Sequence, residues 1–146
     1  MQSSSGIHNH NIGIFGTSFF AGIVGNACGI TAMLPFDNAT VVCGCGGGHD
    51  IAPWLARALS VAPRLVLDAD ALNALAGRAS ILTSCKIPPI LTPHPGEMAR
   101  LETGSTSQSV NSDRIGTACG FARARGVFVV LKGARTVVAR PDGAAA

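Results

Sequence analysis

Residues Pro89 to Leu101 read P-I-L-T-P-H-P-G-E-M-A-R-L, which predicts a short strand, a stiff loop and a helix. The prolines on both sides of His94 exclude a continued strand and an early helix, so the strand should end near Thr92. Pro95 in a first helical turn, with Glu97 near the positive end of the helix dipole, favours a helix start. His94 is therefore fixed in a strand-to-helix loop, the place where α/β proteins bind ligands, although the imidazole could equally do no more than cap backbone groups.

A second loop of this kind is rich in glycine. The β-branched strand expected at Thr40 to Cys43 opens onto G-C-G-G-G-H-D at residues 44–50. Glycines let the backbone approach a ligand and leave amides free, which is typical of phosphate contacts. Asp50 is expected to cap a helix that begins near Ile51. Taken alone this motif is weak, since a glycine-rich turn is often only a turn.

A third loop carries two carboxylates. The strand expected at Arg64 to Leu67 ends in D-A-D-A-L-N, from Asp68 to Asn73. Such a pair can position a metal, a sugar hydroxyl or a general base. One of them, above all Asp70, could instead serve only as the cap of the short helix that follows.

The fourth loop contains one of the two lysines in the sequence. The most strand-like segment, Val127 to Leu131, runs into K-G-A-R-T at residues 132–136, and a further strand is expected from Val137 to Arg140. An ammonium at a sheet end beside a glycine can hold a phosphate, so Lys132 is a candidate phosphate ligand. An ordinary turn with a solvated lysine is an equal alternative.

Helices are expected between the strands. Ala52 to Val61 has one apolar face, and a helix from Ser112 to Ala124 should turn Ile115, Ala118 and Phe121 inward. Two segments are expected to be irregular connections, namely Ser80 to Cys85 and Gly104 to Ser112. Four successive units of strand, loop and helix predict an α/β fold with a mainly parallel sheet flanked by helices. The four loops would then share one edge of the sheet.

The composition narrows the class of protein. The chain has 146 residues, of which 47% are hydrophobic and 13% charged, so a single domain with a substantial core is expected. Its net charge of +3 comes from scattered basic residues, which argues against nucleic-acid binding. Five cysteines without a C-x-x-C pair fit a reducing cytoplasm, with Cys43 and Cys45 as small apolar fillers.

The amino-terminal part is less informative. Residues 1–11 read as a disordered tail. From Asn11 to Phe36 no side chain is charged, and Ile12 to Leu34 would be long enough to span a bilayer as a helix. Five glycines within the stretch and the absence of a preceding basic residue disfavour a membrane span. A buried strand at Phe19 to Val24 followed by a glycine-rich turn is preferred.

In sequence order, V-V-C-G-C-G-G-G, L-V-L-D-A-D-A-L-N, L-T-P-H-P-G-E-M-A-R-L and V-V-L-K-G-A-R-T resemble the ribokinase-like ADP-dependent NAD(P)H-hydrate dehydratases, the carboxyl-terminal domain of YjeF-type proteins. The match begins near Thr40, and residues 12–146 are taken as a partial ribokinase-like domain. The resemblance implies a lyase that dehydrates the S-epimer of hydrated NADH or NADPH while ADP is converted to AMP. Hydrated NAD(P)H, ADP and Mg²⁺ are thus the implied ligands.

The resemblance also implies roles for individual residues. Gly44, Gly46 and His94 would contact the hydrated dinucleotide. The ADP site would be lined by Lys132, Gly133, Ala134, Arg135 and Thr136. The phosphates and magnesium would lie beside Asp68, Asp70 and Asn73, with no separate protein metal site. The chemistry agrees, because phosphoryl transfer needs cationic and backbone N–H stabilisation, and a phosphorylated hydroxyl is a better leaving group.

Departures from the family pattern limit these expectations. Cys45 and Gly47 stand where family members usually have proline and leucine, and family members continue to a G-G-x-G-D segment whose aspartate is expected to activate the hydroxyl, whereas this sequence ends at Ala146. We therefore expect a fold incomplete at its carboxyl terminus, impaired dehydratase activity and association between copies of the chain. The alternatives are a small-molecule kinase of the same superfamily and a non-catalytic nucleotide-binding remnant.

Overall fold

The computed structural model describes residues 10–12, 14–15, 23–25, 40–46 and 51–146. The expected tail at residues 1–11, the uncharged stretch and the Asp50 cap lie wholly or mainly outside these residues. Of the strand expected at Phe19 to Val24, only Ile23 and Val24 are described. They belong to β3, Ile23–Gly25, which pairs with β1, His10–Ile12, in a separate two-stranded sheet. No helix in the described segments is long and apolar enough to cross a membrane.

The main sheet has six strands in the order β2-β4-β5-β6-β7-β8. The strands β4, β5, β6 and β7 are parallel. The outermost strands, β2 and β8, each run antiparallel to their neighbour. Their bounds are Ile14–Phe15 (β2), Thr40–Cys43 (β4), Arg64–Leu67 (β5), Ile90–Leu91 (β6), Phe128–Leu131 (β7) and Val137–Ala139 (β8). The predicted α/β fold with a mainly parallel sheet is confirmed.

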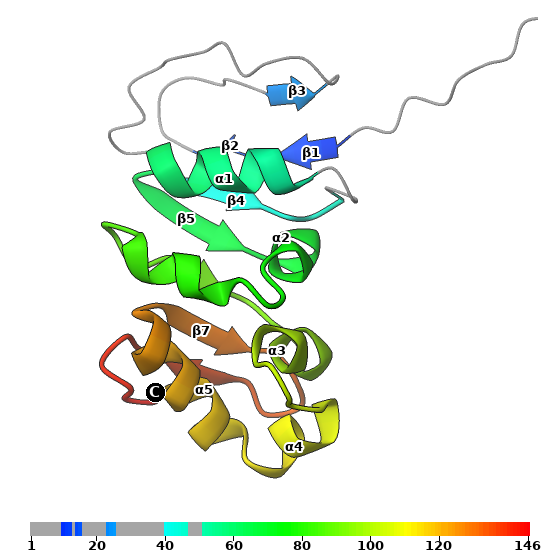
Figure 1. Cartoon of the computed structure of the whole chain (residues 1–146), viewed down its shortest axis with the longest axis vertical. Coiled ribbons are helices and arrows are strands. Elements are labelled where there is room, and N and C mark those ends of the chain that lie inside the picture. Colours follow the sequence, from blue (N-terminus) through cyan, green and yellow to red (C-terminus); the bar gives the residue numbers. More distant parts are fainter. Residues whose placement is uncertain (1–9, 13, 16–22, 26–39, 47–50) are drawn as a thin grey trace, which may run out of the picture.

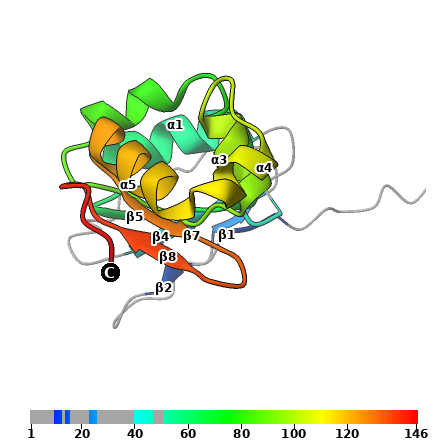
Figure 2. The same ribbon diagram turned by 90° about the horizontal axis from the view of Figure 1, so that it is seen from below.

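The helices gather on one face of this sheet (Figure 2). They are α1 (Ile51–Val61), α2 (Ala69–Ala74), the 3-10 helix η1 (Ala79–Ser84), α3 (Pro95–Leu101), α4 (Ser107–Ser112) and α5 (Arg114–Arg125). Alternation along the strands decides which side chains they cover. Leu65 and Leu67 are buried, while Val66 between them is only partly buried.

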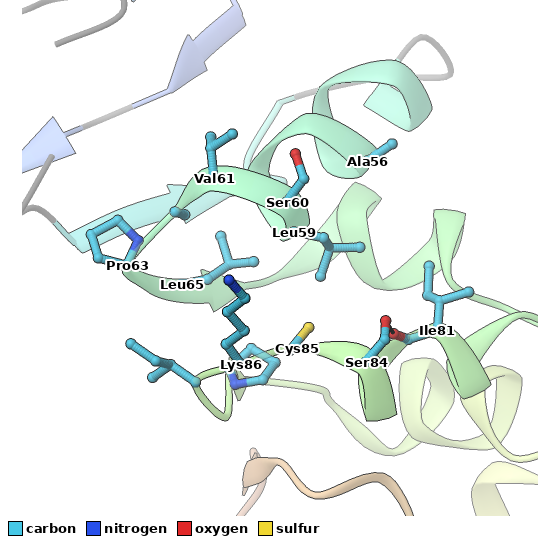
Figure 3. A pocket seen from close by; sticks show the side chains of 13 residues that line it. Ala56, Leu59, Ser60, Val61, Pro63, Leu65, Ile81, Ser84, Cys85 and Lys86 are labelled. Atoms are coloured by element: carbon cyan, nitrogen blue, oxygen red, sulfur yellow. Dashed lines mark hydrogen bonds between the residues drawn. The ribbon is translucent and has the colours of Figure 1, made fainter. Parts of the chain in front are cut away.

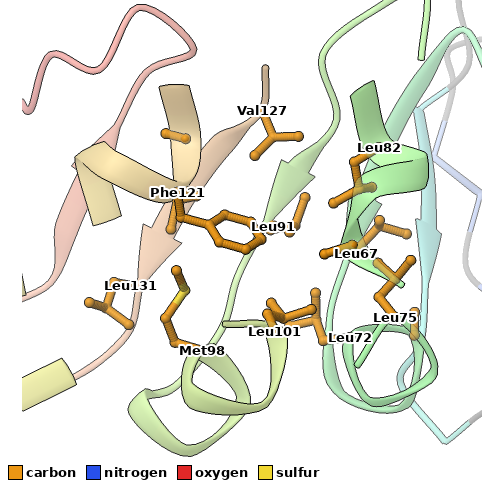
Figure 4. Close-up of a cluster of buried hydrophobic side chains, with 14 of the residues drawn as sticks. Leu67, Leu72, Leu75, Leu82, Leu91, Met98, Leu101, Phe121, Val127 and Leu131 are labelled. Carbon is orange, nitrogen blue, oxygen red and sulfur yellow. The ribbon is translucent and has the colours of Figure 1, made fainter. Parts of the chain in front are cut away.

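The hydrophobic core lies between the sheet and these helices (Figure 4). Strands β5, β6 and β7 contribute Leu67, Leu91 and Leu131, each with no exposed surface. Helical side chains close over them, and the largest are Leu72, Leu75, Leu82, Met98, Leu101 and Phe121. Burial of side chains of this size stabilises the fold by about 1.5–3 kcal/mol each. This core fixes the ends of the strands, and therefore the loops that follow them.

Two of the expected connections are helical instead. Ser80 to Cys85 falls largely within η1. Gly104 to Ser112 contains α4, because Thr106 begins a capping box in which its hydroxyl accepts from the Ser109 amide while the Ser109 hydroxyl accepts from the Thr106 amide. The polar composition that suggested a loop is therefore the composition of a helix cap.

The predicted helix from Ser112 to Ala124 is α5, and it begins at Arg114 because Asp113 caps it by accepting from the Gly116 amide at 2.8 Å. Gly126 ends it in the left-handed conformation, with φ of 65°. The prediction that Ile115 turns inward is wrong, since Ile115 is 61% exposed. It lies in the first turn, and the buried stripe begins one turn later at Ala118.

Candidate functional site

The four parallel strands bring the four predicted loops to one edge of the sheet. Figure 1 shows the arrowheads of β5 and β7 pointing to the same side, where α2 and α3 lie. Backbone hydrogen bonds join successive loops: the Thr92 amide donates to the Leu67 carbonyl at 3.0 Å, and the Lys132 amide donates to the Pro93 carbonyl at 2.8 Å. Backbone hydrogen bonds alone therefore connect these loops to one another.

Lys132 lies between two carboxylates at this edge. Its Nζ donates to Asp68 Oδ1 at 2.7 Å and lies 3.9 Å from Glu97 Oε2. Among the described residues Glu97 is the only charged one that is buried, whereas the side chain of Lys132 is 41% exposed. The Lys132 ammonium is thus bound by Asp68, while part of the side chain remains accessible to solvent.

Asp68 is charged under ordinary conditions. Partial burial alone would raise the pKa of its carboxyl, but the hydrogen bonds from Lys132, from Thr92 and from the Ala69 amide outweigh burial and hold the pKa below its ordinary value. Asp68 occupies the cap position of α2, yet its side chain makes no capping hydrogen bond. The alternative that Asp70 is the cap is wrong, because Asp70 lies inside the first turn of α2.

Backbone hydrogen bonds, and not a side-chain cap, stabilise the turn at Asp68. The Asp68 amide donates to the Cys43 carbonyl at 3.0 Å, and the Asp70 amide donates to the Gly44 carbonyl at 3.3 Å. Ala69 has a φ of 46°, a strained value for a residue other than glycine. Such strain at a sheet edge is common where the backbone positions functional groups.

His94 does cap its helix, as the more modest alternative predicted. Its Nδ1 accepts from the Gly96 amide at 2.9 Å and from the Glu97 amide at 3.3 Å, and Glu97 Oε2 accepts from the His94 amide at 2.8 Å. Because Nδ1 is an acceptor, the proton of a neutral ring is on Nε2, which lies 3.5 Å from Glu97 Oε1. The side chain is 51% exposed, so part of the ring also remains open to a ligand.

The glycine loop is described only as far as Gly46. Gly44 has a φ of 126°, and a Cβ there would lie 1.7 Å from the Asp68 carbonyl oxygen, so this glycine permits two loops to approach each other. Gly46 has a φ of 72°, and none of the described residues lies within 4 Å of the place its Cβ would take. Cys43 is a buried filler, and burial together with nearby Cys45 raises its pKa to about 11. Cys45 is exposed, so the prediction that it too is a filler is wrong.

The loop at residues 132–136 is exposed from Gly133 to Thr136. Its anchor is Arg114 at the start of α5, whose guanidinium donates to the carbonyls of Leu131, Lys132 and Arg135 at 3.0–3.2 Å. Sequence reasoning missed Arg114. Its partners are backbone groups 17 to 21 residues away, and no local pattern marks such a contact.

Asn73 forms a hydrogen bond to a side chain of α3. Its Oδ1 accepts from Arg100 Nε at 3.0 Å, which joins α2 to α3. Within the described segments no three His, Cys, Asp or Glu side chains gather closely enough to hold a metal ion. One carboxylate such as Asp68 still suits Mg²⁺ that arrives on a nucleotide, because Mg²⁺ is commonly held by one or two carboxylates plus substrate phosphates.

A pocket of about 590 Å³ lies at the opposite, amino-terminal ends of the strands (Figure 3). Val61, Ile81 and Ile87 line it with Lys86 and Cys85. Partial burial raises the pKa of the Cys85 thiol. None of the residues predicted for the site lies in this pocket, so the polar edge and the pocket are separate features.

Known proteins share both the sequence and the fold. The profile of the NAD(P)H-hydrate dehydratase family matches residues 36–146. The chain is 44% identical over 111 residues to the ADP-dependent (S)-NAD(P)H-hydrate dehydratase of Neisseria meningitidis serogroup B, which covers 72% of this chain and 37% of that one. It is 54% identical over 78 residues to the bifunctional NAD(P)H-hydrate repair enzyme of Moorella thermoacetica, covering 53% and 14%.

A solved structure extends the comparison to three dimensions. The ADP/ATP-dependent NAD(P)H-hydrate dehydratase from Bacillus subtilis, co-crystallized with ATP and Mg²⁺, superposes with a TM-score of 0.61 at 34% identity over 73% of this chain and 37% of that one. The chain therefore spans well under two thirds of the length of these relatives. Because the family profile matches most of the chain, and the fold agrees, the chain belongs to the NAD(P)H-hydrate dehydratase family.

Proposed function

We propose that this chain provides the nucleotide-binding and substrate-binding sheet edge of an ADP- or ATP-dependent dehydratase that acts on the S-epimer of hydrated NADH or NADPH. The observation that carries the proposal is the ammonium of Lys132, which is held 2.7 Å from Asp68 and remains 41% exposed beside the loop at residues 133–136. A cation fixed in this way suits the phosphates of a nucleotide. Family membership supports the choice of substrate.

Each residue at the edge has a distinct part in the proposal. Lys132 and the backbone of the exposed loop would bind the ADP phosphates, and Asp68 would keep the ammonium in place. His94, with half of its ring exposed, would contact the hydrated dinucleotide together with the glycine loop. Mg²⁺ bound to the nucleotide would neutralise phosphate charge. Asp68 and Asp70, in the loop that follows β5, are the carboxylates that would hold it.

Replacement of Lys132 tests the nucleotide half of the proposal. Lys132→Ala should weaken ADP binding by about 1.5–3 kcal/mol, the range for a hydrogen bond to a charged group. Calorimetry measures the change. Lys86→Ala is the matched control, because Lys86 is the other lysine and lies at the opposite, amino-terminal ends of the strands. Equal ADP affinity in the Lys132 variant and the native protein would return Lys132 to the role of a solvated turn residue.

The reaction itself is tested by incubating the protein with ADP, Mg²⁺ and hydrated NADH. Slow recovery of the absorbance of reduced nicotinamide is the expected result, in agreement with the impaired dehydratase activity that the sequence predicts. ATP-dependent phosphorylation of an alcohol without that recovery would favour the kinase alternative. We also propose a cytoplasmic location, because the four described cysteines are free thiols.

A further inference from the structure

Arg114 makes an unusual set of contacts for a residue outside the predicted motifs. Its Nη2 donates to the carbonyls of Leu131 and Lys132 at 3.0 Å and to that of Arg135 at 3.1 Å, and its Nε donates to the same Arg135 carbonyl at 3.2 Å. The remaining nitrogen, Nη1, donates to Asn111 Oδ1 at 3.0 Å. One guanidinium thus holds both ends of the turn that carries Lys132.

The charge of Arg114 is balanced by dipoles. Among the described residues no carboxylate forms an ion pair with it. Three carbonyl oxygens converge on the guanidinium instead, and a fork of five donors is the group that can satisfy several acceptors at once. A positive charge therefore lies directly behind the exposed turn, where it adds to that of Lys132.

Because the peptide bond is planar, fixing the carbonyls of the loop also fixes the directions of its amides. In a trans peptide the carbonyl and the following N–H point in opposite directions. Since the carbonyls of Lys132 and Arg135 point to Arg114, the amides of Gly133 and Thr136 point away from it. Both residues are exposed. Backbone amides that face outward beside a lysine are the donors that a phosphate group requires.

Gly133 is matched to this arrangement. A Cβ at residue 133 would lie 2.8 Å from Arg114 Nη2, and the φ of 155° lies in the range that residues with a side chain rarely adopt. The glycine therefore leaves room for the guanidinium. The close contact shows that Arg114 and the turn fit each other as a unit.

We propose that Arg114 is a positioning residue for the phosphate-binding loop: it fixes the carbonyls of residues 131, 132 and 135, so that the Lys132 ammonium and the outward amides are preformed for the phosphates of the nucleotide. The inference rests on the proposed function for the identity of the ligand. The anchoring of the turn by Arg114 is independent of it. Arg114 acts through the loop and has no assigned contact with the ligand.

The test compares Arg114→Ala with Arg123→Ala. Arg123 lies on the same helix and donates to the Asp142 carbonyl at 3.2 Å, so its loss removes a bond from a guanidinium to a carbonyl outside the Lys132 turn. ADP binding measured by calorimetry should weaken about tenfold in Arg114→Ala, the equivalent of one hydrogen bond to a charged group, and should not change in Arg123→Ala. Arg114→Lys should not restore affinity, because an ammonium lacks the fork geometry, while added guanidinium ion should restore it in part to Arg114→Ala.

Hydrogen exchange separates this inference from the proposed function. The amide of Lys132, which donates to the Pro93 carbonyl at 2.8 Å, should exchange faster in Arg114→Ala than in the native protein, and at the native rate in Arg123→Ala. If ADP does not bind the native protein but this pattern is found, the anchor is correct and the nucleotide assignment fails. Unchanged exchange in Arg114→Ala, or a lower melting temperature with unchanged ADP affinity, would overturn the inference.

Discussion

Two loops at the same sheet edge begin helices in opposite ways. In the loop from β6 to α3, His94 caps the helix with its own side chain, and Glu97 completes the capping box. In the loop from β5 to α2, Asp68 occupies the same cap position but makes no capping bond, and its carboxylate pairs with Lys132 instead. Aspartate is the better capping residue of the two by general preference. The structure reverses that preference.

The difference between the two loops shows why the Asp68 side chain is not needed as a helix cap. Around Asp68 the backbone does the work of the cap, because Cys43 and Gly44 accept from the Asp68 and Asp70 amides and Ala69 takes a strained φ of 46°. Around His94 no comparable backbone contact is present in the described residues, and the imidazole is needed for the helix start. A cap residue becomes available for chemistry where the end of a neighbouring strand and the loop after it supply backbone acceptors for the helix amides.

The largest expected effect comes from removing that backbone support. Gly44→Ala would place a Cβ 1.7 Å from the Asp68 carbonyl oxygen at a φ of 126°, so the two loops must separate. The expected loss is about 3–5 kcal/mol of unfolding free energy, from overpacking and backbone strain together. Chemical denaturation measures it.

Gly46→Ala is the matched control two residues further along. It has a positive φ of 72°, but none of the described residues lies within 4 Å of the Cβ position, so strain alone should cost about 1–2 kcal/mol. Equal losses in the two variants would show that the approach of Gly44 to Asp68 contributes nothing. The comparison between the two loops would then lose its physical basis.

The second effect concerns the buried carboxylate of the His94 loop. Glu97→Ala removes the acceptor of the His94 amide and should cost about 2 kcal/mol, within the range for a buried donor left without a partner. Glu97→Gln keeps an oxygen at that position, so it should retain most of the stability. If Gln is as damaging as Ala in urea denaturation, the charge of Glu97 beside Lys132 matters more than the capping box.

The sequence predicted the strand-loop-helix order well because proline, glycine and β-branched residues act locally. The helix start at Pro95 and the end of α5 at Gly126 follow from such signals. The sequence also placed His94 and Lys132 at the same edge. It could not predict that Lys132 pairs with Asp68, because the partners are 64 residues apart and meet only through the parallel register.

Arg114 and Ile115 show the same limit from the other side. Both are adjacent on α5, and periodicity marked Ile115 as a core residue while Arg114 carried no signal. In the structure Ile115 is exposed and Arg114 holds the Lys132 turn. Where the helix sits over the sheet decides both, and that placement is a property of the packed core.

The third effect separates the two tasks of His94. His94→Ala should lower stability by about 1 kcal/mol through loss of the cap, and His94→Asn should restore it, because asparagine accepts the same amides. Thermal unfolding measures the stability. Binding of hydrated NADH should be weakened in both variants if the imidazole also contacts the dinucleotide. Recovery of both properties with Asn would assign His94 to capping alone.

The smallest effect belongs to the ion pair of Asp68 with Lys132, and its signature is a pH dependence. Since both side chains are partly exposed, Asp68→Asn should cost no more than about 1 kcal/mol at neutral pH. The folded-state pKa of Asp68 is lowered, so the stability it contributes is present above the unfolded-state value of 3.8 and is lost as the pH falls through the lowered folded-state value. The unfolding free energies of the native protein and Asp68→Asn should therefore converge in acid.

Asp142 provides the comparison that sharpens this result. The pKa of Asp142 is also lowered, by the Ala144 amide and Arg140, but the pair is exposed on both sides. Salt should weaken the Asp142 contribution more than that of Asp68, because solvent ions reach an exposed pair freely. A native protein and an Asp68→Asn variant that differ by a constant amount from neutral pH into acid would show that the carboxylate charge is not what holds Lys132. The release of Asp68 from capping would then need a reason other than the ion pair.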